Sequence, residues 1–71
     1  MGETQLDRKI KRNLINARKE ARLSQTEVAK ILGLDQSTIS KFELGIISPN
    51  ASNMKKISEL YNKDVNFLLF S

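Results

Sequence analysis

Apolar residues recur along this chain at the three- and four-residue spacing of helices, in five separate segments. The first segment spans about residues 7–21, and the last spans Val65 to about Leu69. No segment alternates apolar and polar residues in the manner of a strand. The pattern predicts an all-α fold of five helices, with a flexible N-terminal arm at 1–6 and a single domain over 7–71.

The first helix has an apolar stripe along one side. Thr4 or Asp7 stands where its N-cap is needed. The stripe consists of Leu6, Ile10, Leu14, Ala17 and Ala21. The opposite face is basic and carries Arg8, Lys11, Arg12, Lys19 and Arg22. This basic face is either simply solvated or turned toward a polyanion.

Two short helices joined by a tight turn are predicted in the middle of the chain. Ser24 and Glu27 have the spacing of a capping box, in which each side chain bonds the other's backbone N–H, so a helix begins directly after Ser24. Gly33 can adopt the left-handed conformation that ends a helix. Asp35 is a suitable N-cap for the next helix, which runs from Gln36 to Glu43.

Each of these two helices has one apolar side. Val28, Ala29 and Leu32 form the inward stripe of the first, and Ile39 and Phe42 form that of the second. The outward face of the second helix is polar and nearly free of negative charge. Its members are Gln36, Ser37, Ser40 and Lys41.

The last part of the chain holds two further helices. Pro49 prevents the preceding helix from continuing, and Asn50 caps the fourth helix. Asp64 caps the fifth, which is too short to be stable unless Val65 and Leu68 pack on the rest. The inward stripe of the fourth helix is predicted to be Ala51, Met54, Ile57, Ser58 and Tyr61.

Composition narrows the possible functions. With 71 residues the chain forms one small domain. It contains no cysteine and no histidine, so we expect no disulfide, no metal and no cofactor. A net charge of +4 favours a polyanionic partner. No apolar run approaches the length of a membrane span, and the N-terminus lacks the apolar core of a signal peptide, so we expect a cytoplasmic protein.

The central segment resembles the helix-turn-helix of the phage repressor and Cro family, also called the xenobiotic-response-element type. Ala29, Gly33 and the apolar residues of both helices stand where that motif needs them. The resemblance continues through Arg18 upstream and Gly45 downstream, and it covers about residues 10–69. It implies that the two short helices cross at roughly 90 to 120°.

Arg18 and Glu43 are candidates for an ion pair, because each lies at the border of the apolar stripe of its helix. In the resembling family, an arginine at this position clamps the glutamate that ends the recognition helix. The implied role is mainly structural, and the free edge of the guanidinium could also contact a phosphate.

The resemblance implies sequence-specific binding of double-stranded DNA, with the helix 36–43 in the major groove. The residues expected to contact bases are Gln36, Ser37, Ser40 and Lys41; glutamine suits adenine and lysine suits guanine. Those expected to contact phosphates are Ser24, Gln25, Arg18 and Asn50. We therefore expect a nucleoid-associated transcriptional regulator that acts as a repressor.

A two-fold dimer on a pseudo-palindromic operator is expected, because one recognition helix reads only a few base pairs. In the resembling family, the loop after the recognition helix and the fifth helix pack against their symmetry mates. The dimer contacts implied here are Ile46, Ile47, Phe67, Leu69 and Phe70.

The same apolar residues also favour an alternative function. The chain could be a protein-interaction module on this fold, such as an antitoxin or anti-repressor-binding partner. An enzyme is not expected, because without histidine or cysteine a hydrolase would need a serine and lysine pair, and these residues are scattered over helix surfaces. The arm at 1–6 is either frayed or, as in some DNA-binding proteins, reaches around the duplex.

Overall fold

A computed structural model describes the backbone of residues 5–71 and the side chains of residues 8–71. Within this range the chain forms helices and turns and no strand, as the sequence predicts. The expected arm at 1–6 lies mostly outside the described residues, and the first helix begins two residues earlier than expected. The helices are α1 (Gln5–Glu20), α2 (Gln25–Leu32), α3 (Gln36–Leu44), α4 (Ala51–Tyr61) and α5 (Val65–Phe70).

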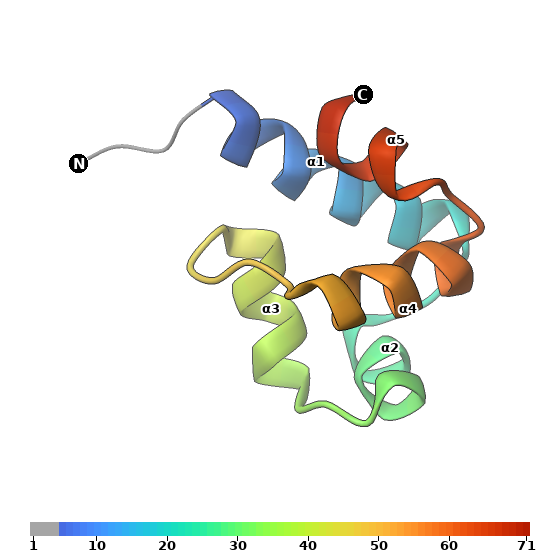
Figure 1. Ribbon diagram of the computed structural model, residues 1–71. Helices are drawn as coiled ribbons and strands as arrows, with labels where there is room; N and C mark the ends of the chain where they lie inside the picture. Colours follow the sequence, from blue (N-terminus) through green and yellow to red (C-terminus); the bar gives the residue numbers. More distant parts are fainter. Residues whose placement is uncertain (1–4) are drawn as a thin grey trace.

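Helix α1 is the element against which most of the others pack. It contacts α3, α4 and α5, while α2 packs chiefly against α3. Figure 1 shows α1 crossing the molecule, with α5 on one side of it and the α2–α3 pair on the other. The result is a compact body of 32 × 23 × 21 Å in which the start of α3 lies far from α5.

The core consists mainly of the predicted apolar stripes. Ile10 in α1 and Ala21 just after it are half-buried members of the predicted first stripe. The side chain of Leu6 lies outside the described residues. The prediction for Ala51 is wrong: it is exposed, because it is the first residue of α4 and directly follows an exposed loop. The buried apolar residues are Leu14, Ala17, Val28, Ala29, Leu32, Ile39, Phe42, Met54, Ile57, Tyr61 and Leu68.

The ends of α2 form as predicted. The Ser24 hydroxyl accepts from the Glu27 backbone N–H at 3.1 Å, and the Ser24 N–H donates to the Glu27 carboxylate at 2.9 Å. Gly33 ends the helix in the left-handed region, with φ of 71°. Asp35 occupies the N-cap position of α3, but its side chain makes no capping hydrogen bond. Helix α3 therefore starts on backbone bonds to the Asp35 carbonyl alone.

Asn13 attaches α5 to α1, a role that the sequence did not suggest. Its side-chain amide donates to the carbonyls of Phe67, Leu68 and Ser71, at 3.3, 3.0 and 3.1 Å. The last carbonyls of a helix lack intrahelical partners. The Phe67 carbonyl also accepts from the Ser71 N–H, and Asn13 acts as a further cap supplied by another helix. Because Asn13 is itself buried, these bonds also satisfy its own polar group.

Helix α5 packs more of its surface than expected. The Asp64 carboxylate caps it by accepting from the Asn66 N–H at 2.7 Å. Leu68 is fully buried, and Val65 and Leu69 are half-buried against the core. Leu69 was expected at an exposed dimer surface. Successive helical residues are about 100° apart, so Leu68 and Leu69 both reach the buried side.

We predict that Gly45→Ala destabilises the protein more than Gly33→Ala. Both glycines have positive φ, 76° and 71°, where an alanine costs roughly 1 to 2 kcal/mol. At Gly45 an added Cβ would also collide with the side chain of Lys11, whereas nothing lies within 4 Å of that position at Gly33. Denaturant melts of the two variants give the comparison.

The Lys11→Ala background identifies the cause of any difference. There the collision is gone, so Gly45→Ala should cost no more than Gly33→Ala does. Equal losses for the two glycine variants in the wild-type background would show instead that Lys11 moves aside freely and that backbone strain alone matters.

Candidate nucleic-acid interface

The predicted base-contacting residues all lie on the accessible side of α3. Gln36, Ser37 and Lys41 are exposed, and Ser40 is half-buried. The buried residues of the same helix, Ile39, Phe42 and Glu43, lie on its other side. Helix α3 therefore presents a short polar surface that bears one positive charge, and its apolar side holds it on the core.

The predicted ion pair between Arg18 and Glu43 is present, and its geometry is bidentate. Arg18 Nε donates to Glu43 Oε2 at 2.7 Å, and a terminal guanidinium nitrogen donates to Oε1 at 3.0 Å. The Arg18 side chain is 13% exposed, and the Glu43 side chain is 5% exposed. The hydrogen bond to Glu43 raises the pKa of Arg18 above its ordinary value, although burial opposes this. Both charges are thus held inside the protein.

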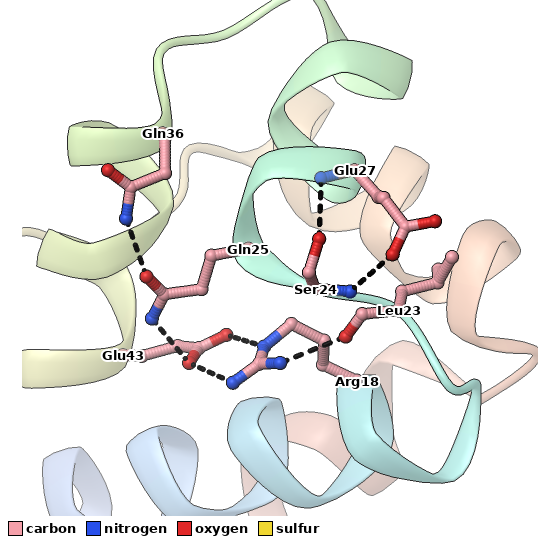
Figure 2. Close-up of polar contacts among 7 residues, drawn as sticks. All are labelled: Arg18, Leu23, Ser24, Gln25, Glu27, Gln36 and Glu43. Carbon is pink, nitrogen blue, oxygen red and sulfur yellow. Dashed lines mark hydrogen bonds and ion pairs between the residues drawn. The ribbon is translucent and has the colours of Figure 1, made fainter.

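Arg18 directs its remaining hydrogen bonding inward as well. Its other terminal nitrogen donates to the Leu23 carbonyl at 2.9 Å, in the segment between α1 and α2. Figure 2 shows the guanidinium enclosed between this carbonyl and the Glu43 carboxylate. Arg18 therefore has little free surface for the phosphate contact that the sequence suggested, and its geometry is that of a structural residue.

Gln25 and Gln36 are joined to this pair, which the sequence reading did not anticipate. Gln25 Nε2 donates to Glu43 Oε1 at 3.0 Å, and Gln36 Nε2 donates to Gln25 Oε1 at 2.7 Å. Figure 2 shows the four side chains in one continuous line from α1 to the start of α3. Gln25 and Gln36 are the first residues of consecutive helices. The helix-turn-helix brings the starts of α2 and α3 close together. The position of a glutamine at the start of each helix could therefore have predicted the contact between them.

The start of α2 offers backbone donors for an anion. The Glu27 N–H is taken by the Ser24 hydroxyl, but the N–H groups of Gln25 and Thr26 precede the first intrahelical bond of α2 and have no acceptor within the helix. Bonding to the backbone and hydroxyl of Ser24 lowers the pKa of Glu27, so its carboxylate is charged at neutral pH. A phosphate here would meet two oriented N–H groups and one nearby negative charge.

Asn50, another predicted phosphate contact, lies away from this cluster at the start of α4. The Asn50 side-chain oxygen accepts from the Asn53 N–H at 2.8 Å, so the side chain caps α4. The residue as a whole is exposed. The loop before it packs on α1, where Ile47 and Pro49 line a small hollow with Ile10.

Four of the five predicted dimer contacts are exposed. Ile46 and Phe70 are the most exposed, at 64% and 61%, and Phe67 and Ile47 follow at 44% and 42%. The Lys63 ammonium lies 5.0 Å from the centre of the Phe67 ring. The sequence reading overlooked the exposure of Ile31, which lines a shallow groove between α2 and α4 with Leu60.

Neither a metal site nor a membrane span is found in the part of the chain that the structure describes. No three acidic side chains gather closely enough to hold an ion. None of the described helices is long and apolar enough to cross a bilayer.

Arg18→Ala and Glu43→Ala should each destabilise the fold by about 3 kcal/mol, because each leaves a partly buried charge without its partner. An exposed pair contributes only about 0 to 1 kcal/mol. Urea melts of both single variants and the double variant give the coupling free energy between the two side chains. Glu20→Ala is the matched control, since it breaks the more exposed pair with Lys63. Singles as stable as this control would contradict a structural role.

Tyr61→Phe should flatten the loss of stability at alkaline pH. Burial raises the pKa of Tyr61 from 10.0 to about 12, and the negative charge of Glu43 adds to the rise. Since the folded pKa exceeds the unfolded one, this contribution is complete below about pH 10 and is lost as pH rises toward 12. Denaturant melts at pH 9 and pH 11 give the free energy of unfolding of wild type and Tyr61→Phe. The prediction is contradicted if the difference between the two proteins is the same at both pH values.

Comparisons with known proteins agree with this geometry. A family model described as helix-turn-helix matches residues 14–68. The chain is also similar to the ImmF control region 10 kDa protein of Bacillus phage phi105, with 41% identity over 51 residues, which are 72% of this chain and 57% of that protein. No solved structure matches the chain significantly. The chain spans little more than half the length of this relative, and it belongs to the phage repressor and Cro-type helix-turn-helix family of DNA-binding regulators.

Proposed function

We propose that this protein represses transcription by binding a pseudo-palindromic operator as a dimer, with α3 of each protomer in the major groove. The observation that carries the proposal is the polar face of α3, where Gln36, Ser37 and Lys41 are exposed while the opposite side is anchored in the core. A rigid helix with short side chains at its N-terminal end can approach base edges closely.

The roles of the individual residues follow from their chemistry. The Gln36 amide has an oxygen that can accept from N6 of adenine and an NH₂ group that can donate to N7. Lys41 can donate to O6 and N7 of guanine. Ser37 and Ser40 are small enough to let the helix approach. The start of α2, with Ser24 and the neighbouring N–H groups, holds a phosphate next to Gln36, and Asn50 holds a second phosphate at the start of α4.

The exposed apolar residues support the dimer. Exposing large apolar side chains to water is unfavourable for a 71-residue protein. Covering them with a second copy of the chain is therefore favourable. A weak interface is sufficient, because two protomers bound to one operator are already held close together. Half-sites should then be centred roughly 34 to 36 Å apart.

Selection of bound sequences from random duplexes is the first test of the proposal. The expected product is a pseudo-palindrome whose halves are one helical turn apart. Failure to enrich any sequence, together with the capture of a specific protein by the apolar residues, would favour the alternative of a protein-interaction module.

Lys41→Ala should weaken binding to the selected site by about 1 to 3 kcal/mol and relax the preference at one base pair. Gln36→Ala should cost a similar amount and relax a different base pair. Titrations on the selected site and on random DNA distinguish a base contact from a phosphate contact. Lys55→Ala is the matched control, because it removes an exposed lysine from α4. Equal losses on both DNAs would make Lys41 a phosphate contact instead.

Phe70→Lys should abolish cooperative occupancy of the two half-sites while sparing weak binding to one. Phe70 is preferable to Phe67 for this test because it is more exposed and, among the described side chains, no cation lies on its ring. Ile31→Lys is the control, since Ile31 is 58% exposed on a different surface, between α2 and α4. Binding isotherms on full and half operators give the answer. Unchanged cooperativity in Phe70→Lys would rule out a dimer through this residue.

A further inference from the structure

Leu44 is the one exposed apolar residue of α3, a helix that the structure describes from end to end. It is the last residue of the helix and is 60% exposed. The other apolar residues of α3, Ile39 and Phe42, are buried in the core. The remaining exposed residues of the helix are polar. Packing in the core therefore does not account for a leucine at this position.

Leu44 lies on the side of α3 that carries the residues proposed to contact bases. It follows Ser40 by four positions and Ser37 by seven, which is nearly two full turns. The three side chains therefore leave the helix within about 60° of one another around its axis. The buried residues of α3 lie on the opposite side. Leu44 thus extends the recognition surface by one turn and adds an apolar group to it.

The direction of the Leu44 side chain brings its methyl groups back over this surface. In an α-helix the Cα–Cβ bond tilts toward the N-terminus, so a side chain covers the turn before its own Cα. For Leu44 that turn contains Ser40 and Lys41. The short Ser40 side chain leaves the leucine uncovered, in agreement with its high exposure. An apolar group therefore stands beside Lys41 on the face proposed to enter the groove.

DNA offers one apolar group of matching chemistry in the major groove. A leucine side chain can neither donate nor accept a hydrogen bond, so it cannot hold a phosphate or pair with the polar atoms of a base edge. Thymine alone among the four bases presents a methyl group there, at C5. Contact between this methyl group and Leu44 removes apolar surface of both partners from water, which is favourable.

We propose that Leu44 reads a thymine of the operator by apolar contact with its 5-methyl group. The inference rests on DNA binding by α3, as proposed above, and it adds a specificity residue to Gln36 and Lys41. The rise of 1.5 Å per residue places Leu44 about 12 Å along the helix axis from Gln36. Neighbouring base pairs are only about 3.4 Å apart, so Leu44 and Gln36 read different base pairs.

Replacing thymine with uracil tests this contact, because uracil lacks only the 5-methyl group. Each thymine in one half-site of the selected operator is replaced in turn, and the affinity of the protein is measured on every duplex. At one position, uracil should weaken binding of wild type by about fourfold, the effect of returning one buried methyl group to water.

Three variants assign the effect to Leu44. Leu44→Ala should bind the thymine and uracil operators equally at this position, because its side chain is too short to reach the methyl group. Leu44→Met keeps a long apolar side chain and should keep a preference for thymine. Ile31→Ala is the matched control, since it shortens a side chain of similar exposure, 58%, on the surface between α2 and α4. This control should show the full loss with uracil. Each variant is compared with itself on two operators, so a change in stability cancels.

The outcomes separate this inference from the proposed function. If wild type selects a sequence but uracil has no effect at any thymine, the contact is overturned and DNA recognition by α3 stands. The same holds if Leu44→Ala keeps the full loss with uracil, because another residue then contacts the methyl group. If wild type binds all duplexes equally, the proposed function fails, and the inference fails with it. A thymine preference that is absent only in Leu44→Ala supports the contact.

Discussion

The carboxylate of Glu43 joins three helices. It belongs to α3, accepts two bonds from Arg18 of α1, and accepts a third from Gln25 of α2. A buried ion pair contributes little net stability compared with apolar packing, because the cost of removing both charges from water offsets their attraction. Its hydrogen bonds are directional, however, and apolar contacts are not. The pair therefore fixes how α2 and α3 sit on α1 more strictly than the core could alone.

Helix α1 supplies the polar anchors for both halves of the molecule. Arg18 holds the helix-turn-helix, and Asn13, five residues earlier, holds the C-terminal end of α5 through three carbonyls. A domain of this size buries a limited apolar area, so packing alone specifies its arrangement weakly. Asn13 and Arg18, two largely buried polar side chains on one helix, provide that specificity through directional hydrogen bonds.

The small core also explains why apolar side chains remain at the surface. Ile46 and Phe70 stay largely exposed, whereas Phe42 and Leu68, a few residues earlier in the chain, are buried. Four of the exposed apolar residues, Ile46, Ile47, Phe67 and Phe70, lie on the loop after α3 and on α5, away from the start of α3 (Figure 1). The polar face of α3 and these apolar residues thus lie on different parts of the surface.

The sequence by itself determined the five helices, the capping box of Ser24, the glycine that ends α2, and the outward polar face of α3, because helix periodicity and end signals are local properties. It also indicated the Arg18–Glu43 pair, since both residues border apolar stripes. Tertiary structure alone decided that Asn13 caps α5, that Leu69 turns inward, and that Gln25 connects Glu43 to Gln36. These contacts join residues up to 58 positions apart in the chain. They depend on the angles at which helices cross, which no local pattern contains.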